Sequence, residues 1–170
     1  GVEEGKPLDI VVTAGISGGT GSGTFLDLVY LIRYLMKEFY PNSKFNILGY
    51  LIMPEVNISN ISQLAPASKL LLETTAFSAL KELDFWMNYD QHRMSFTQKY
   101  SNTITYKWGT APFNDVVLLG NTRVDGTIIA DAYNYTMNVL AESVLNFFAN
   151  EEKEAGSPIG YQSHSVNVGT

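Results

Sequence analysis

The glycine-rich segment Gly15–Thr24 is the part of the chain whose residue types and spacing best indicate chemistry. It follows the apolar run Ile10–Val12 and precedes an amphipathic segment that begins at Phe25. That order is typical of a strand, a loop and a helix. Glycine at four of the six positions from 18 to 23 removes the β-carbons that would hold a bulky anion away from the backbone. The loop N–H groups and the positive end of the following helix can then bind phosphate.

The predicted phosphate contacts fall on consecutive residues, with hydroxyl groups interleaved among the glycines. They are Gly18, Gly19, Thr20, Gly21, Ser22 and Gly23, with Thr24 as a further hydroxyl. No Gly-Lys-Ser/Thr ends the segment, so it is not a P-loop, and its glycine spacing does not fit Gly-x-Gly-x-x-Gly. The alternative is a tight strand-to-helix turn without a ligand. We expect Gly21→Val to block phosphate approach while leaving the fold intact.

The composition indicates one compact domain and excludes several classes of site. The chain has 170 residues, of which 45% are hydrophobic and 16% charged. A net charge of −6 without a basic run argues against nucleic acid or an anionic membrane as the main partner. The chain has no cysteine, and His92 and His164 are too far apart to suggest a metal cluster. With no secretory signal and no apolar run of membrane-spanning length, we expect a cytoplasmic protein.

Strand-like and helix-like segments alternate along the chain. The predicted strands are 8–14, 45–53, 116–119 and a short one at 163–168; the predicted helices are 25–39, 70–87 and 127–150; 95–100 and 103–108 form a β-hairpin. This pattern predicts an α/β fold, a three-layer, Rossmann-like, doubly wound and mostly parallel sheet with a flanking hairpin. Because the first strand comes so early, we expect residues 1–170 to be a single, partial domain whose earlier βα units lie upstream.

Three predicted strands end in segments that suit a nucleotide, namely Gly15–Thr24, Pro54–Asn60 and Gly120–Asp125. Ligands of parallel sheets bind at the carboxyl ends of the strands, so these segments should share one rim. Glu55 offers a carboxylate that can accept hydrogen bonds from ribose hydroxyls. The Asn121 amide both donates and accepts, as reading a purine edge requires. Taken singly, each residue has a plainer interpretation as a turn former or solvated side chain.

The residues from Gly18 to Gly23 resemble the tubulin signature Gly-Gly-Gly-Thr-Gly-Ser-Gly, with Ser17 in place of its first glycine, and the matching loop of the bacterial division protein FtsZ. The resemblance continues through most of residues 8–150, loosely in 57–66 and in the hairpin. Leu51–Glu55 resembles the sugar-binding loop, and Val117–Asn121 resembles the strand whose final asparagine contacts guanine. Ala130–Tyr133 resembles the start of the family's long central helix, which implies that Tyr133 stacks on the base.

This resemblance implies a bacterial tubulin-like protein that binds GTP or GDP with Mg²⁺ and assembles head to tail with itself into filaments. In the family, acidic residues of a neighbouring subunit complete GTP hydrolysis. We cannot match that acidic loop in 151–170, where Glu151, Glu152 and Glu154 look like a solvated helix end. Catalytic residues therefore stay unassigned, and GTPase activity is expected only of the full-length protein.

The sequence departs from the family pattern in the central helix. Met137 stands where the family places a base-reading Asn or Asp. Asn134 and Asn138 flank that position, and Asn138 is retained as a candidate base contact.

Two other functions stay open at this point. Gly15-Ile16-Ser17-Gly18-Gly19 satisfies the Gly-x-Ser-x-Gly nucleophile elbow of α/β-hydrolases, with Ser17 as nucleophile, Asp115 or Asp131 as acid and His164 as base. Against it, a true elbow begins its helix at once, whereas the small residues here are expected to delay the helix. No His-Gly-Gly-type oxyanion segment occurs either. The other alternative is a tubulin-like structural or assembly module without catalysis.

Overall fold

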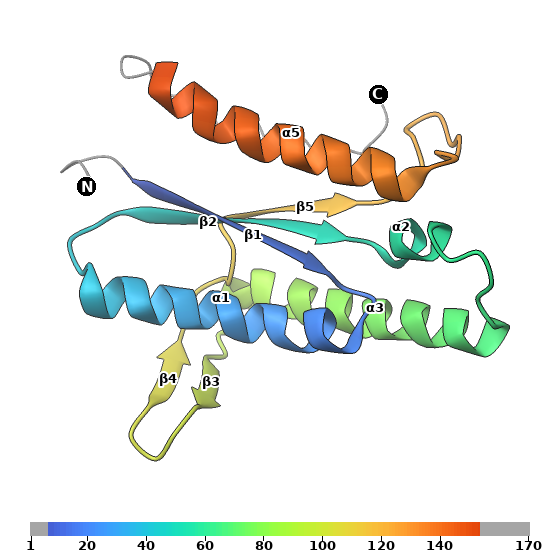
Figure 1. Cartoon of the computed structure of the whole chain (residues 1–170). Helices are drawn as coiled ribbons and strands as arrows, with labels where there is room; N and C mark the ends of the chain where they lie inside the picture. The colour runs from blue at the N-terminus through green and yellow to red at the C-terminus, as the bar shows by residue number, and fades with distance from the viewer. Residues whose placement is uncertain (1–6, 154–170) are drawn as a thin grey trace.

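The computed structural model describes residues 7–153, in which strands and helices alternate (Figure 1). In chain order the elements are β1 (Leu8–Gly15), α1 (Gly19–Phe39), β2 (Phe45–Ile52), α2 (Pro54–Ser59), α3 (Pro66–Met87), α4 (Tyr89–His92), β3 (Phe96–Lys99), β4 (Thr105–Trp108), β5 (Asp115–Leu119) and α5 (Ala132–Lys153). The strand expected at 163–168 lies outside the described residues. No described helix combines the length and apolarity needed to cross a membrane.

The central sheet is parallel and has the strand order β1-β2-β5. Its register pairs Gly15 with Ile52 and Ile52 with Leu119, so the three strands end level with one another. This confirms the α/β class and the parallel sheet. The described strands do not include the reversal of strand order that defines a doubly wound sheet, so that finer feature stays a prediction.

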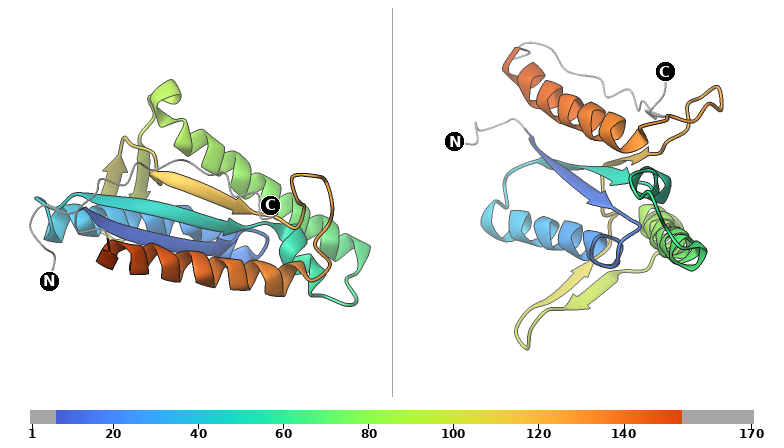
Figure 2. Two further views of the ribbon diagram at one scale, coloured as in Figure 1. Left: turned by 90° about the horizontal axis from the view of Figure 1, so that it is seen from above. Right: turned by 45° about the vertical axis from the view of Figure 1, so that its right-hand side comes forward.

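Helices lie on both faces of the sheet (Figures 1 and 2). On one face, α1 and α3 cover the larger core, whose buried members are Val12, Ile16, Phe25, Leu26, Val29, Ile47, Leu51, Ala76, Ala79, Leu83 and Phe113. On the other face, α5 covers a smaller core of Val117, Leu119, Ile129 and Ala132. Alternate residues of each strand point to opposite faces, and this is why β2 contributes Ile47 and Leu51 to one core and Leu48 to the other.

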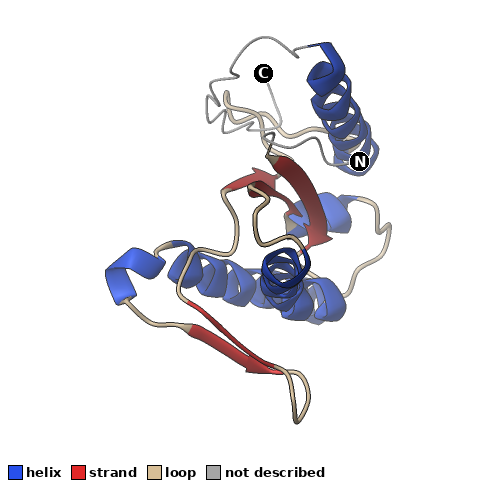
Figure 3. Ribbon diagram, turned by 90° about the vertical axis from the view of Figure 1, so that its left-hand side faces the viewer, coloured by secondary structure: helices blue, strands red, loops and turns tan. Residues whose placement is uncertain are grey.

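The predicted β-hairpin is confirmed as the antiparallel pair β3–β4, which extends away from the sheet on the α1 side (Figures 1 and 3). Tyr30 of α1 anchors it, because its ring stacks on Phe96 with centroids 4.1 Å apart. The Tyr30 hydroxyl donates to the Thr110 carbonyl oxygen at 3.0 Å. Burial raises the pKa of this phenol far above its ordinary value, so Tyr30 stays a neutral donor.

Arg33, one turn after Tyr30, ties α1 to the segment that leads into β5. Its Nε donates to the Pro112 carbonyl oxygen at 2.6 Å, and its Nη2 donates to Asn114 Oδ1 at 3.2 Å. The same Asn114 oxygen accepts the Ile47 N–H at 2.8 Å, which links the contact to β2. Burial lowers the pKa of Arg33 from its ordinary value.

Several predicted helix limits were wrong. α1 begins at Gly19 rather than Phe25, and α3 begins at Pro66 rather than Leu70, where proline suits the first position of a helix. α5 begins at Ala132 rather than Thr127. Before it, Arg123 N donates to Thr127 O, so residues 122–128 form a turn rather than a first helical turn.

The apolar residues of α1 that repeat at helical spacing are only partly buried. Phe25, Val29 and Met36 belong to the buried face. Leu28, Leu35 and Phe39 are 48%, 41% and 68% exposed, although they repeat at helical spacing.

We expect Gly49→Ala to destabilise the fold, because a β-carbon there would lie 2.8 Å from Cε1 of the buried Phe113 ring. Overpacking of this kind lowers the free energy of unfolding by about 1–3 kcal/mol. Urea denaturation followed by circular dichroism measures it. Gly23→Ala is the control, since its β-carbon meets open space within α1 and should add up to about 1 kcal/mol. A Gly49→Ala variant as stable as the parent chain would contradict the packing described.

Candidate functional site

The level ends of β1, β2 and β5 bring three segments to one rim of the sheet. Ile16 N donates to Ile52 O at 3.1 Å, and Met53 N donates to Leu119 O at 2.9 Å, so the chain stays paired just beyond the strands. The segment after β1 leads directly into α1, the segment after β2 is α2, and the segment after β5 is the turn before α5. These are the three segments that the sequence singled out.

The predicted phosphate loop is shorter than expected, because most of its glycines lie inside α1. Gly18 is the N-cap residue, with extended backbone angles (φ −91°, ψ 156°) and no side-chain capping hydrogen bond. Ser22 N donates to Gly18 O at 3.1 Å. The N–H groups of Gly19, Thr20 and Gly21 therefore come before Ser22, the first residue whose N–H donates within the helix, and they point out of the helix end. A phosphate would meet a helix N-terminus here rather than an extended loop.

Two of the three hydroxyls that the sequence assigned to phosphate, those of Ser22 and Thr24, donate within the helix. Ser22 Oγ donates to Gly18 O at 2.5 Å, and Thr24 Oγ1 donates to Thr20 O at 2.7 Å. Serine and threonine commonly make such bonds to the carbonyl four residues earlier. In this conformation neither proton is available to a ligand, and the donors directed at the rim are backbone N–H groups.

The glycines of this segment differ in what surrounds them. A β-carbon at Gly21 would overlap the carbonyl oxygen of Gly15, so Gly21 allows α1 to pack closely on the end of β1. The expectation that Gly21→Val leaves the fold intact was therefore wrong. At Gly18, Gly19 and Gly23 a β-carbon would meet no atom within 4 Å, and their φ angles are not in the positive range that favours glycine. Nothing within the described chain requires glycine at these three positions.

The segment after β2 is the short helix α2, where the sequence analysis predicted no helix. Asn57 of α2 donates from Nδ2 to Ser17 Oγ at 2.9 Å, and Ser17 is only 4% exposed. The same nitrogen would lie 3.3 Å from a β-carbon at Gly15. Asn57 thus fixes α2 against the glycine segment. The sequence analysis assigned no individual role to Asn57. It also missed the helix, although Pro54 at the first helical position and Glu55 in the first turn are helix-start signals.

Glu55 and the start of the β5–α5 turn are neighbours. A β-carbon at Gly120 would lie 2.9 Å from Glu55 Oε1, so the Glu55 carboxylate lies against the backbone just before Asn121. Asn121 Oδ1 accepts the Thr122 hydroxyl at 3.0 Å, and its backbone oxygen accepts Ile129 N at 2.8 Å. Asn121 is half-buried and its position is set by the turn rather than by the strand. The rim therefore carries a carboxylate against the backbone that leads into Asn121.

Farther round this turn, Asp125 caps its own loop. The Thr127 hydroxyl and N–H donate to Asp125 Oδ1 at 2.7 and 2.9 Å. These hydrogen bonds lower the pKa of the Asp125 carboxyl.

The residues predicted from α5 do not all share one face. Tyr133 is half-buried in the first turn of α5, whereas Asn138 is exposed. Five residues at 100° each place Asn138 about 140° around the helix from Tyr133. Met137, one turn after Tyr133, lies on the same face instead. The Asn134 amide contacts the Asp131 carboxylate at 3.0 and 3.2 Å.

The residues proposed for a hydrolase are not brought together in the described part of the chain. α1 begins two positions after Ser17, so the expectation that glycines delay the helix was wrong. The partner of Ser17 Oγ, however, is the Asn57 amide, which donates and cannot act as a base. Asp115 begins β5, about 13 Å along the strand from the rim. His164 lies outside the described residues.

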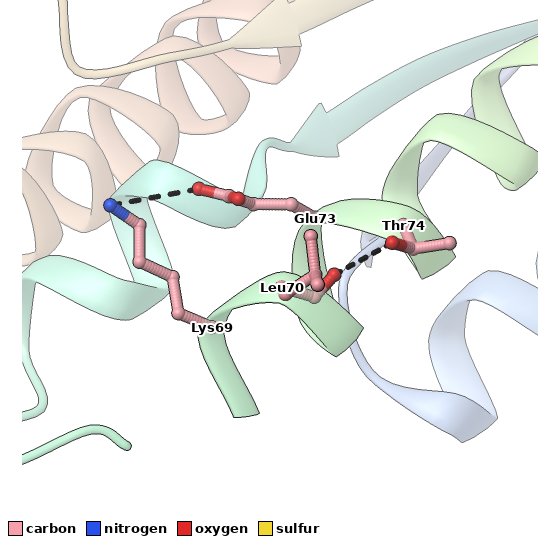
Figure 4. Close-up of polar contacts among 4 residues, drawn as sticks. All are labelled: Lys69, Leu70, Glu73 and Thr74. Carbon is pink, nitrogen blue, oxygen red and sulfur yellow. Dashed lines mark hydrogen bonds and ion pairs between the residues drawn. The ribbon is translucent and has the colours of Figure 1, made fainter. Parts of the chain in front are cut away.

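The first turns of α3 contribute local polar contacts beside the rim rather than a further ligand group (Figure 4). Lys69 Nζ lies 3.7 Å from Glu73 Oε1 on an exposed face, and the Thr74 hydroxyl donates to Leu70 O at 2.7 Å. Exposed pairs of this kind contribute little to stability. Among the residues that the structure describes, no three His, Asp or Glu side chains form a group that could hold a metal ion.

We expect Gly21→Ala to lower the free energy of unfolding more than any other single Gly→Ala change between positions 18 and 23. Its methyl group would meet the fixed Gly15 carbonyl, whereas the methyl groups at Gly18, Gly19 and Gly23 meet open space. A set of four urea denaturation curves measures the order. Equal stability of the Gly21→Ala and Gly19→Ala variants would contradict the close approach of α1 to β1.

Comparison with known proteins adds one finding to this geometry. A family model described as "tubulin like" matches residues 1–168, and the match spans all three segments of the rim. No curated protein and no solved structure matches the chain.

Proposed function

The chain belongs to the tubulin-like family, and on that premise we propose that its rim binds GTP or GDP with Mg²⁺ as part of a cytoplasmic assembly module of a bacterial tubulin-like protein. The phosphates would lie over the first turn of α1 and the base against the start of α5. The ribose would lie between them, beside α2.

The observation that carries this proposal is the open space at Gly18, Gly19 and Gly23. Glycine inside a helix is less favourable than alanine by about 1 kcal/mol. Gly18 is the N-cap residue and lies outside the helix interior, so this cost does not apply to it. At Gly21 the close packing on β1 accounts for the glycine, but at Gly19 and Gly23 neither packing nor backbone angle does. Because the glycines have no side chains, a ligand can approach the N–H groups of Gly19, Thr20 and Gly21. A helix N-terminus with such free donors is suited to phosphate.

The remaining contacts follow from the neighbouring side chains. Glu55 would accept hydrogen bonds from the ribose hydroxyls, and Asn121 with Tyr133 would hold the base. Asn138 points away from Tyr133's face, so base recognition is assigned to Asn121 in preference to Asn138. Mg²⁺ prefers oxygen ligands in octahedral geometry and would be held mainly by phosphate oxygens and water.

Hydrolysis and filament formation are proposed for the full-length protein alone. Self-association head to tail would bring acidic residues of a second copy to the phosphates. The second candidate is a structural module that has lost its ligand. One observation favours it, namely that the Ser22 and Thr24 hydroxyls already donate within α1. Assembly that needs nucleotide would separate the first function from the second.

We expect Gly19→Val to weaken GTP binding by about tenfold or more. Its side chain would project toward the helix N-terminus and block the N–H donors, each of which contributes about 1.5–3 kcal/mol when bonded to a charged group. Calorimetric titration of GTP, GDP and ATP with Mg²⁺ measures it, in this chain and in the full-length protein. Ser78→Val on the exposed face of α3 is the control. GTP binding unchanged by Gly19→Val would refute the phosphate site, and no binding by either parent protein would favour the structural module.

A second test concerns the sugar. We expect Glu55→Ala to weaken GTP several-fold and to leave 2′,3′-dideoxy-GTP unaffected, because the dideoxy sugar has no hydroxyls for the carboxylate. Competition of both nucleotides against a fluorescent GTP analogue gives the two affinities. Equal losses for both nucleotides would mean that Glu55 acts through the position of α2 and Gly120 rather than on ribose.

A further inference from the structure

The hairpin β3–β4 leaves the outer edge of β4 without a partner strand in the described part of the chain. β4 pairs antiparallel with β3 alone, in a sheet of two strands. A groove of about 390 Å³ runs along this edge. All four residues of β4 line it on one side, and Tyr34, Lys37 and Glu38 of α1 line it on the other. The hairpin extends beside α1, away from the sheet (Figure 1).

The backbone of β4 presents hydrogen-bonding groups to this groove. Tyr100 N donates to Ile104 O at 2.9 Å, which marks a hydrogen-bonded pair at the end of the hairpin. Bonded and non-bonded pairs alternate along an antiparallel ladder. Counting from Tyr100 and Ile104 in the observed register, the N–H and C=O groups of Thr105 and Lys107 point away from β3. Both residues are exposed, so a further strand can reach these groups.

Aromatic rings and ammonium groups line the groove. Tyr106 packs on Tyr34 with ring centroids 4.1 Å apart, and Lys37 Nζ lies 5.2 Å from the centroid of the Trp108 ring. The Trp108 Nε1 donor is buried and has no hydrogen-bond acceptor among the described residues. Buried indole donors ordinarily have a partner. Lys37 and Lys107 outnumber the one acid of the groove, Glu38.

The charge of the hairpin is opposite to that of the chain as a whole. Residues 93–109 contain Arg93, Lys99 and Lys107 and no aspartate or glutamate, whereas the net charge of the chain is −6. The positive hairpin attracts an acidic partner, whereas the net negative charge of the rest of the chain repels it.

We propose that the edge of β4 binds an extended acidic segment of a partner protein as a third strand of the hairpin sheet. Backbone bonds to Thr105 and Lys107 would give affinity, as in other cases of strand addition. Lys37 approaches from the α1 side, and Lys107 lies on the outer face with Thr105. Because neighbouring residues of a strand point to opposite faces, two consecutive acids would reach both lysines.

This site is independent of the nucleotide rim. Gly19 and Lys37 lie near opposite ends of α1, about 27 Å apart along the helix. Loss of nucleotide binding would therefore leave the proposed strand site intact, and the reverse also holds.

The test uses the whole chain and a fluorescein-labelled peptide, Thr-Val-Glu-Glu-Val-Thr, in a fluorescence anisotropy titration at low salt. We expect saturable binding that Lys37→Glu with Lys107→Glu weakens by about tenfold or more. Arg93→Glu with Lys99→Glu is the matched control, since it changes the charge by the same amount and both residues are exposed and lie outside the groove. We expect Glu38→Gln to tighten binding of the peptide, because it removes the one negative charge of the groove, which repels the glutamates of the peptide.

One further peptide separates strand addition from general charge attraction. The same peptide with alternate backbone nitrogens methylated should bind at least about tenfold more weakly, because it cannot donate to the β4 edge. Equal binding of the methylated peptide, or an equal loss in the Arg93→Glu, Lys99→Glu control, would overturn the proposal. So would the absence of binding, or self-association of the chain that the double variant abolishes, since a second copy would then occupy the edge.

Discussion

The close approach of α1 to the end of β1 is the constraint on which the rest of the structure depends. Because Gly21 has no side chain, the helix backbone can lie against the Gly15 carbonyl. This contact directs the free N–H groups of the first turn toward the rim where β2 and β5 also end. The same 21-residue helix carries Tyr30 and Tyr34, whose rings contact the hairpin.

α1 therefore connects two surfaces of different chemistry. Its N-terminal turn is built of glycines and backbone donors, and it meets α2 through Asn57 and Ser17. Its second half carries Tyr30 and Arg33, which hold the hairpin and the segment before β5. The helix has an exposed apolar side between these ends, at Leu28 and Leu35.

Much of this architecture could be predicted from the sequence, and the failures have physical causes. The apolar runs around Val12, Ile47 and Val117 identified the parallel strands and hence the shared rim. The start of α1 was missed because glycine has low helix propensity, whereas here packing on β1 forms the first turn. α2 was missed because six residues show too little periodicity. The exposure of Leu28, Leu35 and Phe39 could not be predicted from the sequence. The spacing of apolar residues shows which side of a helix is apolar, but it does not show which elements cover that side.

The contacts between the hairpin and the body of the protein include aromatic ring contacts and hydrogen bonds to neutral carbonyl oxygens. Tyr30 donates to the Thr110 carbonyl oxygen just after the hairpin, and Tyr100 of the hairpin donates to the Asp27 carbonyl oxygen of α1. Dissolved salt screens attraction between charges but affects stacking and such hydrogen bonds little. The hairpin is therefore expected to keep its position at salt concentrations that release a ligand bound through lysine side chains. Ionic strength would then control the occupancy of the groove beside β4 without changing the shape of the groove.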